Sequence, residues 1–302
     1  MKQVPIYEPE FIEKVISNLS IYRALEIDTN NVLTFNKKET IAFNKIINQY
    51  QKIELYNDAH DSNLNYLDPE MIIKLSNYFL SLILPKFTDE ILAYDSILDF
   101  QEENLEDVGL NYRVVNKNVE LGYISLEDNY NEYSISIIAH EKVHALCFNH
   151  LDTVELFNEG LELFPIFIQK LVIYEMMKYT DSLVSTYSEI IRSNDCRKCV
   201  HFLKLSHYLH NNKDKTPLDE LVSEYFRIKS TDYLKADIYS NLLMTYYIQD
   251  RNTMIEKLEK LFCRKITIPE FLDYYNISID RKENIPLLKE NLYKTKRIIF
   301  TP

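Results

Sequence analysis

Residues 136–148 read SIIAHEKVHALCF and contain the pentapeptide HEKVH at positions 140–144. Apolar residues surround the pentapeptide at helical spacing, so we expect a helix over the whole stretch. Side chains four residues apart share one face of a helix, and His140 and His144 can therefore present two imidazoles to one metal ion. Glu141 would project beside them, toward a water molecule on the metal. This spacing predicts a metal site of the catalytic kind.

A third ligand is expected in the segment that follows, FNEGLELF at residues 157–164. Glu159 lies on what the pattern predicts to be the next helix, and a helix hairpin would bring it to the metal. Two imidazoles and one carboxylate leave a fourth position open for water, as in catalytic zinc sites. Gly160, expected inside that helix, costs about 1 kcal/mol of helix propensity and indicates a close approach by another group. Glu162 is the alternative ligand, and the Asn-Glu-Gly context favours Glu159.

HEKVH followed by FNEGLELF resembles the gluzincin metallopeptidases, whose third zinc ligand is a glutamate on the helix after the HExxH helix. The NEGL stretch is similar to the NEGFA-type segment of aminopeptidase-N-like enzymes and to the EGLAEYF-type segment of the thermolysin-like superfamily. The resemblance covers residues 134–164 and implies His140, His144 and Glu159 as zinc ligands and Glu141 as the general base. The chain departs from the family in a shorter interval before the glutamate, in a second acid shifted by one position and in the absence of a GAMEN-type segment.

The resemblance also implies two features outside the motif. Gluzincins carry an edge strand before the HExxH helix that pairs with substrate backbone, and residues 122–126 are the matching strand, with Gly122 and Tyr123 as substrate-binding residues. An ordinary hairpin strand is the alternative. Gluzincins usually supply a Tyr or His to the oxyanion from a later helix. Tyr239 is the candidate here, followed by Tyr246, although packing accounts for most of the 23 tyrosines.

Periodicity along the chain predicts an α+β protein that is predominantly α, with a small sheet before the HExxH helix and a helical C-terminal lobe. The resemblance implies that this fold is that of a zincin-like metallopeptidase. A strand hairpin is expected between residues 110 and 126. Soft boundaries suggest regions 1–85, 86–180 and 181–302, or one continuous domain. Helices are expected near residues 8–25, 38–51, 69–84, 88–98, 133–148, 154–179, 183–192, 196–210, 218–228, 233–249, 253–263 and 287–297.

Composition narrows the classes of function. The formal net charge of −12 repels phosphate backbones and anionic lipid, which argues against nucleic-acid binding. No apolar run is long enough to span a membrane, and the first residues lack the apolar stretch of a signal peptide. Four cysteines are too few for a disulfide framework, so a reducing, cytoplasmic location is expected. Cys196 and Cys199 form a CxxC, for which packing on one helix face is the first interpretation and a redox or metal role the alternative.

These observations lead to one hypothesis and two alternatives. The hypothesis is a zinc-dependent metallopeptidase that hydrolyses peptide or protein substrates with zinc-bound water and the general base Glu141. The main alternative is a non-catalytic interaction or regulatory protein that keeps the zincin fold. A redox or metal-sensing module built on Cys196 and Cys199 is the third. Oligomeric state is left open.

Overall fold

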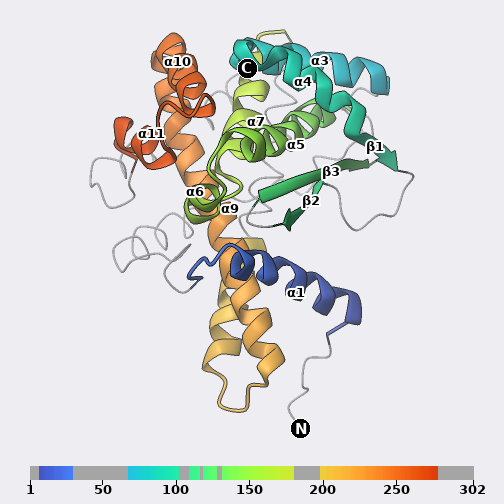
Figure 1. The fold of residues 1–302 in the computed structure, drawn as a ribbon, viewed down its shortest axis with the longest axis vertical. Helices are drawn as coiled ribbons and strands as arrows, with labels where there is room; N and C mark the ends of the chain where they lie inside the picture. The colour runs from blue at the N-terminus through green and yellow to red at the C-terminus, as the bar shows by residue number, and fades with distance from the viewer. Residues whose placement is uncertain are drawn as a thin grey trace, which may run out of the picture.

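Helices make up most of the described chain, and one small sheet lies beside them (Figure 1). This computed structural model describes residues 7–29, 67–101, 109–115, 118–127, 131–179 and 198–277. The arrangement confirms the expected α+β class that is predominantly α. Within the described ranges, no helix is both long and apolar enough to cross a membrane.

The N-terminal half contains most of the elements that surround the HExxH helix. A 3-10 turn at Pro85–Phe87 precedes α4, and a second at Tyr94–Ile97 follows it. The helices and strands are α1 (Pro9–Ala24), α3 (Pro69–Ile83), α4 (Thr88–Ala93), β1 (Leu98–Gln101), β2 (Gly109–Val115), β3 (Asn118–Glu127) and α5 (Glu132–His150).

The C-terminal half is helical throughout its described residues. A helical stretch over 198–211 precedes the long helix α9 and runs beside it. The named helices are α6 (Thr153–Glu159), α7 (Leu163–Met176), α9 (Pro217–Gln249), α10 (Arg251–Phe262) and α11 (Ile268–Tyr274).

Helix α5 carries HEKVH and lies in the middle of the molecule. Its start is fixed by a capping box, in which Asn131 accepts hydrogen bonds from the N–H groups of Tyr133 and Ser134 while the Ser134 hydroxyl accepts one from the Asn131 N–H. Most of its side chains are buried, and it packs against α3, α7, β2 and β3. A helix enclosed on several sides holds its side chains in fixed positions, as a site assembled on it requires.

The sheet has the order β1-β3-β2, with β1 parallel and β2 antiparallel to the central strand β3. The prediction that residues 122–126 form an edge strand is therefore wrong, because β1 pairs with residues 124–127. Residues 88–98 were expected to be one helix, but α4 ends at Ala93, a 3-10 turn follows, and β1 begins at Leu98. Strand β1 was not predicted. Among the described strands, β2 is the edge nearest α5. Close packing of β3 against β2 explains why residue 122 is a glycine, because a Cβ there would lie 2.8 Å from the carbonyl oxygen of Asn111 on β2.

Three further expected helices differ from the structure. The helix expected over 154–179 is divided into α6 and α7, because Gly160 adopts φ 118° and ψ 122° and ends α6. Conversely, the helices expected over 218–228 and 233–249 are one helix, α9. Its Ser-Thr-Asp sequence at 230–232 is typical of a helix start, but all three residues are buried inside the continuous helix.

Other predictions are simpler to place. Helix α11 was not predicted, and the helices expected over 38–51, 183–192 and 287–297 lie outside the described residues. The remaining expected helices agree with the observed ones to within a few residues.

Two buried lysines join the helices that carry the site. Lys142 of α5 donates to Asn77 Oδ1 of α3 at 2.5 Å and pairs with Asp95, which follows α4. Lys170 of α7 donates to Asp237 Oδ1 of α9 at 2.8 Å. Hydrogen-bonded and paired in this way, the two buried charges fix α5 and α7 relative to their neighbours.

Candidate active site

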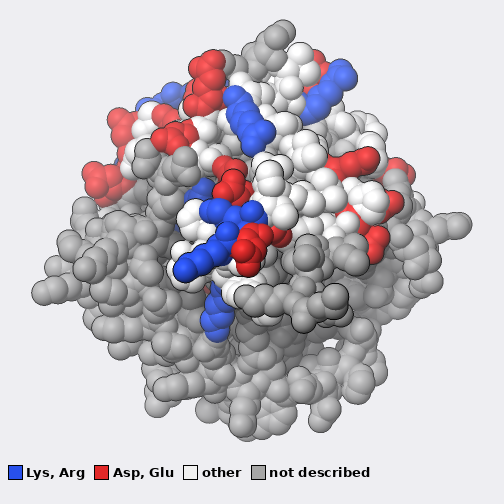
Figure 2. All heavy atoms as spheres, turned by 90° about the horizontal axis from the view of Figure 1, so that it is seen from below, with Lys and Arg blue, Asp and Glu red and all other residues white. Residues whose placement is uncertain are grey.

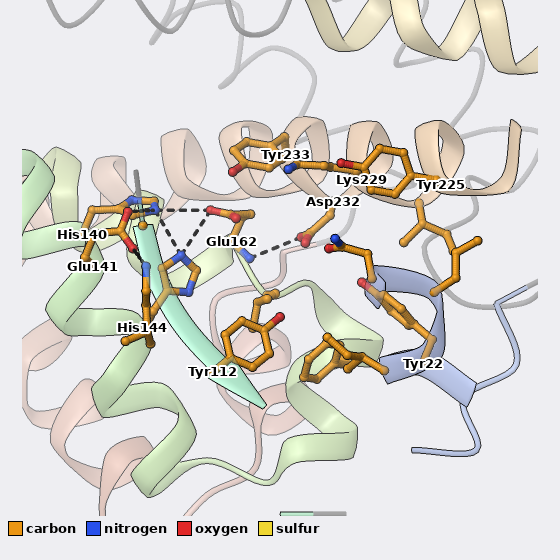
Figure 3. A pocket seen from close by; sticks show the side chains of 18 residues that line it. Tyr22, Tyr112, His140, Glu141, His144, Glu162, Tyr225, Lys229, Asp232 and Tyr233 are labelled. Carbon is orange, nitrogen blue, oxygen red and sulfur yellow. Dashed lines mark hydrogen bonds and ion pairs between the residues drawn. The ribbon is translucent and has the colours of Figure 1, made fainter. Parts of the chain in front are cut away.

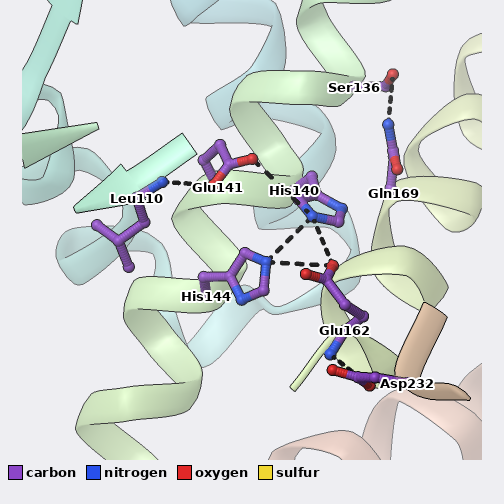
Figure 4. Close-up of polar contacts among 8 residues, drawn as sticks. All are labelled: Leu110, Ser136, His140, Glu141, His144, Glu162, Gln169 and Asp232. Carbon is purple, nitrogen blue, oxygen red and sulfur yellow. Dashed lines mark hydrogen bonds and ion pairs between the residues drawn. The ribbon is translucent and has the colours of Figure 1, made fainter. Parts of the chain in front are cut away.

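Three side chains from two segments converge beside α5 (Figure 4). The Nε2 atoms of His140 and His144 lie 3.1 Å apart. Glu162 Oε2 lies 3.3 Å from the first of these nitrogens and 3.5 Å from the second. Among the described His, Cys, Asp and Glu residues, these three form the group that could hold a metal ion.

The arrangement of these three atoms fits a bound cation. Glu162 Oε2 is buried and has no hydrogen-bond partner among the described residues, although both histidines lie at ion-pair distance. A tetrahedral ion with bonds of about 2.0–2.1 Å keeps its ligand atoms about 3.3 Å apart. The three observed separations are close to this value, so a metal ion would supply the partner that the carboxylate oxygen lacks.

Electrostatics within the group favour the charged carboxylate. Burial alone would raise the pKa of Glu162, but the neighbouring His144 and His140 hold it well below its usual value. Burial would lower the pKa of His144, and the charge of Glu162 raises it instead. Asp232 of α9 accepts a hydrogen bond from the Glu162 N–H at 3.4 Å. Burial and the nearby Glu162 charge raise the pKa of Asp232 to about 7. The ligand carboxylate is thus anchored through its backbone.

Glu159, which the sequence favoured as third ligand, lies elsewhere. Its Oε2 pairs with Lys235 of α9 at 3.2 Å, and it is not part of the His-His-Glu group. Because Gly160 ends α6, the chain turns before α7 begins, and this turn brings Glu162 rather than Glu159 to α5. The preference for Glu159 is therefore corrected to the alternative, Glu162. Reading Gly160 as a helix end instead of an interior residue would have favoured this choice.

Replacement of Gly160 by Ala tests this account of the turn. Its φ of 118° is nearly closed to residues with a Cβ, so Gly160→Ala should lower the free energy of unfolding by about 2 kcal/mol. The same strain should displace Glu162 and reduce metal retention. Denaturant unfolding and metal per chain are the measurements. Val154→Ala, at an exposed position of α6, is the matched control and should change stability by less than about 0.5 kcal/mol. Unchanged stability and metal content in Gly160→Ala would show that the turn does not depend on glycine.

Glu141 is held beside the metal-binding group by the edge strand. Its Oε2 accepts a hydrogen bond from the Leu110 N–H of β2 at 2.8 Å. Its other oxygen, Oε1, lies 3.9 Å from His140 Nε2. One oxygen is therefore fixed by the sheet, while the other lies close to His140 of the metal-binding group. The position beside His140 agrees with the helix spacing, and the role of Glu141 as general base stays a prediction.

A cavity of about 210 Å³ opens onto these groups (Figure 3). Helix α5 and strand β2 form one side, and α1 and α9 form the other. Four tyrosines line it, and none of them was predicted: Tyr22, Tyr112, Tyr225 and Tyr233. The lining also contains Lys229 and Asp232 of α9.

Tyr233 is the tyrosine most closely tied to the metal-binding group. Burial, the charge of Glu162 and a hydrogen bond to Glu162 raise its pKa well above the usual value, so its hydroxyl stays protonated and can donate. The predicted Tyr239 does not line the cavity and packs with the Lys235 ammonium 5.5 Å from its ring. The second choice, Tyr246, packs on Tyr275 with ring centroids 5.0 Å apart. Tyr233 lies on the same helix six residues before Tyr239, and the assignment of a tyrosine to the oxyanion stays a prediction.

The remaining predicted residues do not meet at this cavity. Gly122 and Tyr123 are absent from its lining, and Tyr123 is exposed. Cys196 lies outside the described residues, so the CxxC remains a prediction. Cys199 lines a second cavity next to the first.

Comparison with known proteins shows that the chain shares its fold with solved peptidase structures. No protein-family model matches the chain, and no curated protein matches it in sequence. A structure named PZ peptidase A with an inhibitor is similar, with a TM-score of 0.55, 11% identity and coverage of 97% of this chain and 59% of that one. A structure assigned provisionally to oligoendopeptidase F is similar with a TM-score of 0.56 and 12% identity. The matched region covers 98% of this chain and 59% of that one. The chain thus spans about 59% of the length of either peptidase. At these identities the likeness shows the fold alone.

Proposed function

We propose that this chain is a zinc-dependent metallopeptidase. The observation that carries the proposal is the convergence of His140, His144 and Glu162 on one point, with an oxygen of Glu141 beside it. Two imidazoles and one carboxylate are a donor set of catalytic zinc sites, which keep a position open. Structural similarity to two peptidases supports the same function. The complete set of ligands and base argues against a scaffold that has lost its activity.

The residues of the chain divide the chemistry between them. His140 Nε2, His144 Nε2 and Glu162 Oε2 would hold Zn²⁺, which when bound polarises a carbonyl and lowers the pKa of water toward neutrality. Glu141 Oε1 accepts the proton of the attacking water while the water oxygen forms a bond to the carbonyl carbon. Glu141 then delivers this proton to the amide nitrogen as the carbon–nitrogen bond breaks. Its Oε2 stays fixed by the Leu110 N–H throughout.

Substrate positioning falls to β2 and α9. The outer edge of β2 borders the cavity through Gly109 and Leu110, and an extended peptide could add to this edge by main-chain hydrogen bonds. Tyr233 lies on the opposite wall, with a hydroxyl that remains protonated. There it would donate a hydrogen bond to the carbonyl oxygen as negative charge develops. β2 thus replaces β3 as the proposed substrate strand.

Metal content and peptide cleavage of the purified wild-type chain test the proposal together. We expect about one zinc per chain and cleavage of members of a fluorogenic peptide library. Treatment with 1,10-phenanthroline should abolish cleavage, and added Zn²⁺ should restore it. A folded, zinc-loaded chain that cleaves no peptide would favour the non-catalytic alternative. A folded chain that binds no zinc would contradict the proposed site itself.

A further inference from the structure

A second cavity, of about 410 Å³, lies directly beside the first. The two cavities share three lining residues, Tyr225, Lys229 and Tyr233, which follow one another at four-residue intervals along α9. This spacing places the three side chains on one face of the helix. We call the second cavity the aromatic–lysine pocket. Because both cavities use the same helix face, a molecule bound in the first can extend into the second.

The floor of the aromatic–lysine pocket is apolar. The rings of Phe202 and Phe226 stack with centroids 4.6 Å apart and an interplanar angle of 2°. Phe11 of α1 lies 5.8 Å from Phe226 and 6.1 Å from Tyr225, centroid to centroid. Such a surface favours a large apolar or aromatic side chain over a small polar one.

The charged residues of the aromatic–lysine pocket are all basic. Among the described residues, its lining contains Lys14, Lys198 and Lys229 and no acidic side chain. This is a local reversal in a chain whose formal net charge is −12. The described surface seen from below carries basic and acidic side chains side by side (Figure 2), so the described part of this face is not a positive patch. A preference of this region for an anionic ligand would therefore come from the lysines that line the pocket.

Lys229 is the lysine at the junction of the two cavities (Figure 3). Its Nζ lies 5.9 Å from the centroid of the Tyr225 ring. No carboxylate in the described part of the chain forms an ion pair with it, and the side chain is exposed to the cleft. Lys229 is a basic side chain that lines both cavities, so an anionic group of a ligand that extends from the first cavity into the second would be attracted toward it.

We propose that the aromatic–lysine pocket binds the carboxyl-terminal residue of the substrate peptide, and that Lys229 pairs with its α-carboxylate. This inference rests on the proposed peptidase function and adds a substrate class to it. A terminal aromatic or large apolar side chain would lie on the phenylalanine rings. Because the two cavities adjoin, the bond that is cleaved lies only a few residues from the terminus. The substrates are therefore peptides with a free carboxyl terminus and an apolar last residue, cleaved close to that terminus.

Three peptides that differ only in the presence and position of one negative charge test the proposal. The first ends in phenylalanine with a free carboxylate, the second is its C-terminal amide, and the third is the amide with an internal Gln replaced by Glu. We expect wild type to cleave the free acid with kcat/KM about fivefold higher than either amide, the effect of one modest ion pair. Lys229→Met should bring the ratio of acid to amide close to one. Lys229→Arg, which keeps the charge, should retain most of the preference.

Lys204→Met is the matched control, because Lys204 is an exposed lysine that lines neither cavity. It should keep the wild-type ratio. Equal cleavage of acid and amide by wild type, or an unchanged ratio in Lys229→Met, would overturn the proposal. A preference that follows the internal Glu instead of the terminus would overturn it as well.

A binding measurement separates this inference from the proposed function. Titration of the wild-type chain with N-acetylphenylalanine and with its amide requires no catalysis. Tighter binding of the acid that is lost in Lys229→Met would support the pocket even if no peptide were cleaved. Equal binding of the two compounds, in a chain that does cleave peptides, would refute the pocket and leave the peptidase proposal intact.

Discussion

Glu162→Gln is expected to lose the bound metal, whereas Glu159→Gln is expected to keep it. An amide in place of the Glu162 carboxylate removes the negative charge that faces His140 and His144 and offers a weaker donor atom. Replacement of groups that merely support metal ligands lowers metal affinity by about 10- to 100-fold, so loss of a ligand should cost at least about 100-fold. Zinc per chain after dialysis against a defined zinc buffer measures the difference.

Glu159→Gln provides the matched control, because it makes the same chemical change three residues away. Glu159 pairs with Lys235 at a partly exposed site, and loss of that pair should change the free energy of unfolding by less than about 1 kcal/mol. Zinc content should therefore equal that of wild type. The reverse pattern, with metal lost in Glu159→Gln and kept in Glu162→Gln, would show that the observed His-His-Glu group is not the metal site.

Much of the fold was predictable because its signals are local. Asp68 and Pro69 begin α3, and the alternation of β2 and β3 identified the hairpin. The motif itself was also local, since His140, Glu141 and His144 need only one turn of helix to come together.

The errors arise where tertiary structure decides the outcome. β1 is four residues long and is a strand only because it pairs with β3 across more than twenty residues of chain. The continuity of α9 through Ser-Thr-Asp at 230–232 depends on burial of these residues, which propensity does not report.

The far wall of the cleft was the least predictable part of the site. Tyr225, Lys229 and Tyr233 reach it from α9, more than eighty residues after HEKVH, so no spacing relates them to the motif. The four-residue interval between them was visible, but it is equally typical of an ordinary packed helix face. Only the packing of α9 against α7 and α1 places this helix face beside the metal-binding group.

Glu141→Gln is expected to keep the metal and lose hydrolysis by at least about 100-fold. Gln is nearly isosteric with Glu, and its carbonyl oxygen can accept the Leu110 N–H that now bonds Oε2. That orientation turns the amide NH₂ toward His140, at the position from which Oε1 would take a proton from water. An NH₂ group cannot accept that proton, so the geometry is preserved while the base is lost. Zinc per chain and kcat/KM on the best library peptide are the two measurements.

Glu120→Gln serves as the control, because Glu120 is exposed on β3, pairs with Arg113 and lines neither cavity. Its activity should stay within about twofold of wild type. Full activity in Glu141→Gln would refute the general base and require another proton acceptor in the cleft. Loss of both zinc and activity would place Glu141 among the groups that hold the metal. The expected result is that Glu141→Gln retains zinc and loses hydrolysis, whereas a variant of a metal ligand loses both. Together with Glu162→Gln, it would separate the residues that hold the metal from the residue that moves the proton.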